Sequence, residues 1–126
     1  MSFHRITVIG HAGSNPDHRV TATGKDYTFF PLYVNERREE SERTTRYRVK
    51  TWGDLALMVK DHLQKGQLLL VDGTPSVEAW RDGNGKPRAQ LVVTARTLRF
   101  LGSRPAGRND AEAADALDEY TDVIRR

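Results

Sequence analysis

Short segments rich in Ile, Val, Leu, Thr and aromatic residues, each ended by a turn signal, fill the first hundred residues. The clearest is 27–35, where Phe30, Leu32 and Val34 alternate with a second apolar row. This period of two is typical of a β-strand, because successive side chains point to opposite faces. Since both rows are apolar, both faces are expected to contact other groups. Pro31 has no N–H to donate, which predicts an edge or a bulge at that point.

The same composition predicts further strands on either side of this segment. The charged stretch 36–45 is expected to be a solvated hairpin loop, and 81–87 is expected to be a second charged turn. The remaining strands are predicted at 4–9, 20–23, 47–52, 68–71 with a continuation toward 75–77, and 88–101.

One helix is predicted in this part of the chain, at 55–65. Leu55, Val59 and Leu63 share one helical face, Asp54 is placed to cap the N-terminus, and Gly66 suits the position after the C-terminus. Apart from the short candidate at 20–23, the element order is read as three strands, one helix and two strands. That order predicts a mainly β protein with a five-stranded Greek-key OB-fold barrel, in which the helix lies between strands three and four.

Composition excludes several classes of protein. The 126 residues contain no cysteine, which excludes disulfides, thiolate metal sites and a cysteine nucleophile. No apolar run approaches the roughly 20 residues of a membrane span, and the first residues do not resemble a signal peptide. A cytoplasmic protein without membrane contacts is therefore expected.

Charge is divided unevenly along the chain. Residues 1–102 contain 16 Lys and Arg against 11 Asp and Glu, a net charge of +5, together with nine of the ten aromatic residues. Residues 103–126 contain four basic and six acidic residues, a net charge of −2. The turn-like stretch 102–107 separates them. The sequence thus predicts a basic folded domain over 1–102 and an acidic, disordered tail over 103–126.

Four stretches of the basic domain occur in a characteristic order. They are 3–13 followed by Asn15, Pro16 and Arg19; 32–37; 47–53 continuing through 55–56 into 63–66; and Gly73 followed by 80–82 and Gly85. Together, over residues 2–102, they resemble the bacterial single-stranded DNA-binding protein family. The resemblance implies an OB-fold and largely sequence-independent binding of single-stranded DNA on a homotetramer. It also implies a nucleoid-associated role in DNA replication, recombination and repair, alongside replication and repair proteins.

The resemblance also implies site residues. Trp52 and Trp80 match aromatic positions of the family, and four basic residues match basic ones: Arg5, Arg19, Arg48 and Lys65. Arg38 and Arg46 stand where the family usually has tryptophans. Because a guanidinium can stack on a base and pair with a phosphate, this replacement predicts binding that depends more on salt. The tail lacks the family's usual linker and its acidic tip closed by an apolar residue.

The residues themselves also point to a nucleic-acid surface. If Val49 points inward, Arg48, Lys50 and Trp52 share the outer face of one strand. Core packing for Trp52 and subunit packing for Trp80 are the structural alternatives, and local ion pairs in a solvated loop are the alternative for the arginines. The predicted DNA-binding residues are Arg5, Arg19, Phe29, Tyr33, Arg38, Arg46, Arg48, Lys50, Trp52, Lys65, Trp80, Arg81, Lys86 and Arg88.

Other functions find less support in the sequence. His4, His11, His18 and His62 show no metal-ligand spacing, and neither a nucleophile elbow nor a glycine-rich phosphate loop is present. No metal, cofactor or enzymatic activity is expected. The alternative to DNA binding is an OB-fold adaptor of a replisome or primosome that acts through protein contacts.

Overall fold

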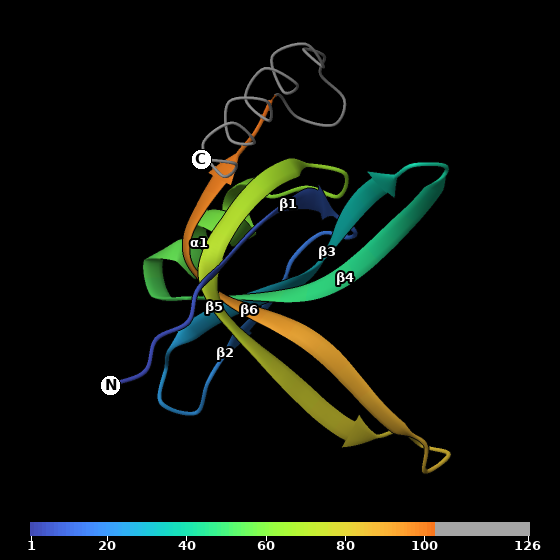
Figure 1. Cartoon of the computed structure of the whole chain (residues 1–126). Coiled ribbons are helices and arrows are strands. Elements are labelled where there is room, and N and C mark those ends of the chain that lie inside the picture. Colours follow the sequence, from blue (N-terminus) through green and yellow to red (C-terminus); the bar gives the residue numbers. More distant parts are fainter. Residues whose placement is uncertain (103–126) are drawn as a thin grey trace.

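The computed structural model describes residues 1–102, which form six strands and one helix (Figure 1). The predicted acidic tail, 103–126, lies outside the described residues. In chain order the elements are β1 (Ile6–Ala12), β2 (Asp17–Val20), β3 (Asp26–Arg38), β4 (Ser41–Trp52), α1 (Gly53–His62), β5 (Leu68–Arg81) and β6 (Pro87–Phe100).

Five of the strands close into a barrel. The sheet order is β1-β5-β6-β4-β3-β2, and an additional pairing between β1 and β3 closes the ring. All neighbours are antiparallel except β4 and β6, which run parallel. The predicted OB-fold barrel is therefore confirmed, with α1 between its third and fourth strands. Strand β2 is an extra strand that pairs only with β3.

The short second strand lies a few residues earlier than predicted, at Asp17–Val20 instead of 20–23. A tight turn occupies the later residues. The N–H of Thr21 donates to the carbonyl of Lys25, and the N–H of Gly24 donates to the carbonyl of Thr21. Gly24 has a φ of 84°, a left-handed conformation that favours glycine. The turn therefore begins where the apolar run had suggested a strand.

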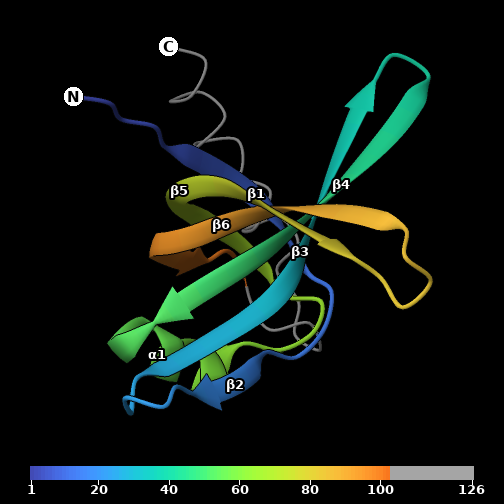
Figure 2. The same cartoon turned by 90° about the horizontal axis from the view of Figure 1, so that it is seen from below.

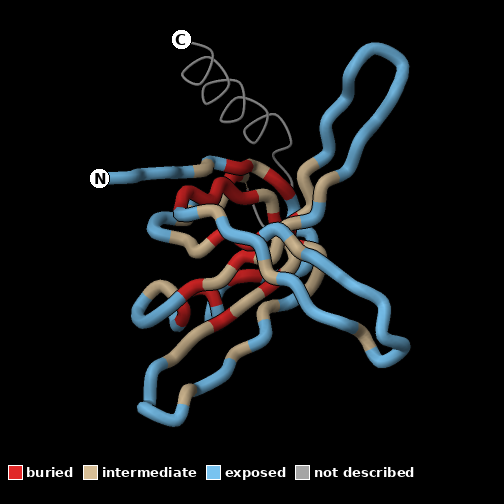
Figure 3. Tube along the Cα trace, turned by 60° about the horizontal axis from the view of Figure 1, so that its bottom comes forward, coloured by how far each residue is buried: buried red, intermediate tan, exposed pale blue. Residues whose placement is uncertain are grey.

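The core fills the inside of the barrel. Phe30, Leu32 and Val49 are fully buried there with residues of β5 and β6, and Val59 of α1 packs against them. Burying a side chain of this size contributes roughly 1.5–3 kcal/mol. Figure 3 shows the buried residues gathered in the barrel and exposed residues along the two projecting hairpins. One apolar row of β3 thus forms the core, and the other row is left facing outward.

Pro31 lies at a break in strand pairing, as its missing N–H predicted. On its outer edge β3 pairs with β1 at Leu32 and with β2 at Phe29. Between them the carbonyl of Pro31 accepts a hydrogen bond from the N–H of Gly13. In a strand the N–H and C=O of one residue point to the same side, so the proline nitrogen faces this gap and interrupts neither ladder.

The β3–β4 hairpin extends well beyond the barrel as a two-stranded arm (Figures 1 and 2). The predicted loop over 36–45 is wrong, because β3 continues to Arg38 and β4 resumes at Ser41. The charged residues pair across the strands: Glu36 lies opposite Arg43, and Arg37 lies opposite Glu42. Opposite charges facing each other stabilise such a ladder.

The β5–β6 hairpin forms a second arm. Strand β5 runs without interruption through 72–81, and a bulge between Asp72 and Gly73 marks the point where it leaves the barrel. The predicted charged turn is confirmed at its end. There the carboxylate of Asp82 accepts hydrogen bonds from the N–H groups of Asn84 and Lys86. Figures 1 and 2 show this arm projecting from the barrel in a different direction from the β3–β4 arm.

The helix begins and ends earlier than predicted. It spans Gly53–His62, so Asp54 lies in the first turn and the capping position falls on Trp52, which makes no side-chain cap. After the helix the chain is extended at Leu63, and Gly66, with a φ of 88°, donates its N–H to the carbonyl of Ala12. The chain after the helix is bound to β1, and the helix therefore ends at His62 although the apolar periodicity continues to Leu63.

Candidate nucleic-acid interface

The outer face of β3 and β4 combines an aromatic row with a cationic row. The inward neighbours Thr28, Phe30, Val49 and Thr51 are buried, so the alternate residues point outward. The predicted outer placement of the β4 cations is therefore confirmed. The cross-strand pairs on this face are Tyr27 with Trp52, Phe29 with Lys50, Pro31 with Arg48, and Tyr33 with Arg46.

Three of the rings form a stacked cluster, Tyr27–Phe29–Trp52. The ring centroids of Tyr27 and Trp52 are 4.9 Å apart with an interplanar angle of 26°, and those of Tyr27 and Phe29 are 5.8 Å apart. Such offset packing holds the rings in place, and Trp52 remains exposed at the end of the cluster. Sequence reasoning missed Tyr27, although the period of two places it in the same row as Phe29.

Arginines lie over the rings of this face. The guanidinium of Arg48 lies 4.6 Å from the centroid of Phe29, and Arg19 of β2 lies 5.5 Å from the same ring. Arg46 lies 6.0 Å from the centroid of Tyr33. These cation–π contacts hold long side chains near the aromatic row. Positive charge and flat π-faces therefore occupy the same surface.

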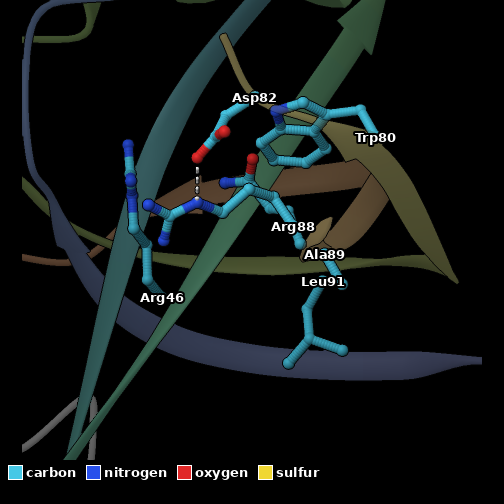
Figure 4. A pocket seen from close by; sticks show the side chains of 7 residues that line it. Arg46, Trp80, Asp82, Arg88, Ala89 and Leu91 are labelled. Atoms are coloured by element: carbon cyan, nitrogen blue, oxygen red, sulfur yellow. Dashed lines mark hydrogen bonds and ion pairs between the residues drawn. The ribbon is translucent and has the colours of Figure 1, made fainter. Parts of the chain in front are cut away.

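The β5–β6 arm adds Trp80, which lies opposite Arg88. A cleft of about 550 Å³, the Arg46 cleft, separates this part of the arm from β4 (Figure 4). A second cleft of about 440 Å³, the Glu78 cleft, lies beside it. Trp80 and Gln90 line both. The other lining residues are Arg46, Asp82, Arg88, Ala89 and Leu91 in the first, and Arg48, Glu78 and Ala79 in the second.

Ion pairs position the arm and its side chains. Lys50 Nζ of β4 lies 2.9 Å from Glu78 Oε1 of the arm, and Arg88 Nε lies 3.1 Å from Asp82 Oδ2. The pKa of Asp82 lies below its ordinary value, chiefly because the Lys86 N–H donates to this carboxylate and also because Arg88 does. A deprotonated Asp82 thus holds the turn and Arg88 together.

The structure brings most of the predicted site residues to one surface. Those on the outer face of β3–β4, on β2 or at the clefts are Arg19, Phe29, Tyr33, Arg46, Arg48, Lys50, Trp52, Trp80 and Arg88. Arg38 lies near the end of the β3–β4 arm, 3.8 Å from Glu36. Arg81 and Lys86 lie at the end of the other arm, where Arg81 donates to the carbonyl of Gly85.

Two predicted residues lie elsewhere. The guanidinium of Arg5 forms a two-pronged ion pair with Asp72, a residue of β5 that is mostly buried. The hydrogen bond from Arg5 lowers the pKa of Asp72. Lys65 follows the helix, and its backbone N–H donates to the side chain of Asn15. Arg5 is thus occupied in joining the chain before β1 to β5.

Within residues 1–102, no cluster of three or more His, Asp or Glu could hold a metal ion. The one helix of this part of the chain is too short to cross a membrane.

Known proteins similar to this chain in sequence are single-stranded DNA-binding proteins. A single-stranded DNA-binding protein of Synechocystis is 31% identical over 115 residues, covering 90% of this chain and 93% of that protein. One from Chlorobaculum tepidum is 29% identical over 119 residues, covering 88% and 72% of the two chains.

Solved structures share the fold. A Plasmodium falciparum SSB in complex with ssDNA matches with a TM-score of 0.69 at 24% identity, over 81% of this chain and 97% of that chain. A small single-stranded DNA-binding protein from Streptomyces coelicolor also gives 0.69, at 22% identity over 79% and 95%. The sequence model of the single-strand binding protein family matches residues 3–101. The chain belongs to the single-strand binding protein family.

Proposed function

We propose that this chain binds single-stranded DNA along the outer face of β3 and β4 and the adjoining side of the β5–β6 arm. As a member of its family it is a non-catalytic, single-stranded DNA-binding protein. The observation that carries the proposed interface is the register of β3 and β4, which places an aromatic row beside a cationic row on one solvent-facing surface.

On this surface the aromatic side chains bind the bases, and the cationic side chains bind the phosphates. Every base has a π-face, so Trp52, Phe29 and Trp80 bind bases without selecting among them, each stacked base contributing roughly 1–3 kcal/mol. Arg48 and Lys50 neutralise phosphates and release counterions, which makes affinity fall as salt rises. The remaining predicted basic residues on the arms extend the same positive surface.

The proposal includes a cellular role. The chain protects exposed single strands during DNA replication, recombination and repair in the cytoplasm, at the nucleoid, together with replication and repair proteins. Residues 1–102 form the binding domain. The acidic segment 103–126 competes with DNA for the basic surface, docks a partner or has no role. Removing 103–126 tests the first of these: higher affinity for oligo-dT at low salt supports competition, and unchanged affinity contradicts it.

We also propose a homotetramer. In support, the arm carries two exposed apolar residues, Val77 and Leu91, which are paired across its strands. Apolar side chains gathered in this way are typical of surfaces that another molecule covers. Light scattering at micromolar concentration measures the assembly, and a monomer there would contradict the tetramer.

Tryptophan fluorescence tests DNA binding directly, because the chain contains only two tryptophans and both are in the proposed interface. Titration with oligo-dT at low salt is expected to quench the emission strongly, and added salt is expected to reverse the quenching. A duplex of the same length should quench far less, and oligo-rU measures the preference for DNA over RNA. If oligo-dT leaves the emission unchanged at low salt, the proposal fails.

A further inference from the structure

The Glu78 cleft contains groups that a sequence-independent stacking surface does not need. It is lined by Arg48, Glu78, Ala79, Trp80 and Gln90, so aromatic, cationic, carboxylate and carboxamide side chains border one cleft. Glu78 and Gln90 face each other across β5 and β6. The Tyr27–Phe29–Trp52 cluster presents rings with arginine beside them. The residues that line the cleft with Trp80 therefore include hydrogen-bond acceptors, whereas arginine beside the Trp52 cluster offers only donors.

A carboxylate is an unexpected neighbour for a phosphate-binding surface, because like charges repel. Lys50 Nζ lies 2.9 Å from Glu78 Oε1 and offsets that repulsion. A carboxylate has two oxygens with about four acceptor sites, and the ion pair with Lys50 involves only one of the two oxygens, Oε1. The Glu78 side chain is still 41% exposed, so acceptor capacity is left for a ligand in the cleft.

We propose that Glu78 makes the Trp80 site selective for bases with an exocyclic amine, and specifically for cytosine over thymine. The base stacks on Trp80, and its amine donates a hydrogen bond to the Glu78 carboxylate. This inference rests on the proposed function, because it concerns which base occupies one position of a DNA-binding surface. Sequence-independent binding elsewhere on the surface is unaffected.

The two pyrimidines differ in the group that they present at the same ring position. Cytosine has the N4 amine, a donor, and thymine has the O4 carbonyl, an acceptor. A carboxylate only accepts hydrogen bonds, so it pairs with the amine and repels the carbonyl oxygen. If Glu78 acted merely as a substitute for phosphate on Lys50, removing its charge would strengthen binding of both bases by the same factor.

The test measures the ratio of oligo-dC to oligo-dT affinity by tryptophan fluorescence, with strands of equal length at pH 8 and fixed salt. In Glu78→Gln the amide nitrogen can donate to the thymine O4. The dC-to-dT ratio is therefore expected to fall roughly fivefold, about the effect of one hydrogen bond to a charged group that is partly exposed. Glu42→Gln removes the same charge from the β3–β4 arm, where Glu42 faces Arg37, and should leave the ratio unchanged.

Three outcomes separate the possibilities. A lower ratio in Glu78→Gln alone supports base reading by Glu78. An equal change for both oligomers, or an unchanged ratio, overturns it and leaves DNA binding intact. Failure of the unmodified chain to bind either oligomer contradicts the proposed function itself. Thermal melting of both variants identifies any general loosening of the arm. Such loosening would weaken the binding of both oligomers by the same factor, which would also count against base reading.

Discussion

Trp52 and Trp80 are exposed to nearly the same extent, 44% and 47%, but their surroundings differ. Trp52 ends a barrel strand and stacks on Tyr27 at 4.9 Å. Trp80 lies on a projecting arm, between two clefts that also contain carboxylates and a carboxamide. Equal exposure therefore does not mean equal function. The barrel site offers a fixed π-surface with cations, and the arm site adds groups that can distinguish the edges of bases.

The difference has its origin in what lies behind each tryptophan. The strand that bears Trp52 has a buried inner row, represented by Val49 and Thr51, and this row fixes its outer face. The part of β5 in the arm, 74–81, has no buried row, and Val77 is exposed behind Trp80. Its position over β4 depends on the bulge at Gly73 and on the Lys50–Glu78 ion pair. Substitutions at the junction, at either tryptophan or at the cations test this difference between the two sites.

The largest effect is expected at the junction between barrel and arm. A Cβ on Gly73 would collide with the backbone carbonyl of Thr94, which cannot move without breaking the β5–β6 ladder. Gly73→Val should therefore destabilise the fold by about 3 kcal/mol or more, the upper range for overpacking. Chemical denaturation measures this loss. Gly83→Ala in the arm turn is the matched control, because its new methyl meets nothing within 4 Å. Equal stability of the two variants would show that close packing at Gly73 does not hold the arm to the barrel.

The next effect concerns the two tryptophans. Trp52→Ala and Trp80→Ala should each weaken oligo-dT binding by roughly 1–3 kcal/mol, measured by anisotropy of a labelled strand. Trp52→Ala should also lower the melting temperature, since it removes the stack on Tyr27. Trp80→Ala should leave melting nearly unchanged. Phenylalanine at either position should restore part of the affinity. If Trp80→Ala binds like the unmodified chain, the DNA interface is confined to the barrel.

The sequence predicts the local part of this arrangement well. A period of two was sufficient to place Arg48, Lys50 and Trp52 on one outer face, because that alternation is a property of a single strand. It failed for 36–45, where charged residues suggested a loop. The pairing of Glu36 with Arg43 stabilises a ladder that composition alone does not reveal.

Contacts between strands that are distant in the chain could not be predicted from the sequence. The stack of Tyr27 on Trp52 depends on the β3–β4 register, and the Lys50–Glu78 pair depends on how the arm leaves the barrel at Gly73. No local pattern encodes either. Arg5 illustrates the same limit, because its partner Asp72 lies 67 residues away. The resemblance to the family marked Arg5 as a basic position of the site. It gave no indication that its guanidinium pairs with a carboxylate.

A smaller effect separates charge from stacking among the arginines. Arg48→Lys keeps the charge and loses the planar group that lies over Phe29 at 4.6 Å. Its oligo-dT affinity should fall several-fold, and the slope of log affinity against log salt should stay the same. Arg48→Ala should reduce that slope by about 1, as should Arg88→Ala on the arm. An unchanged slope in Arg88→Ala would exclude Arg88 from the phosphate contacts, and its ion pair with Asp82 would then explain why.

The smallest effect is the pH dependence of the Arg5–Asp72 pair. Arg5 lowers the pKa of Asp72 in the fold, below the value of about 3.9 expected in the unfolded chain. The unfolded state therefore binds the proton more readily, so the pair stabilises the fold above about pH 4 and loses this effect as pH falls through the folded pKa. Melting temperatures from pH 2.5 to 7 should show Asp72→Asn below the unmodified chain at neutral pH and converging with it in acid. A constant gap across that range would contradict an ionic role for Asp72. Asp82→Asn on the arm is the comparison: its pKa is lowered as well, but its bonds fix only a turn, so its melting temperature should respond less.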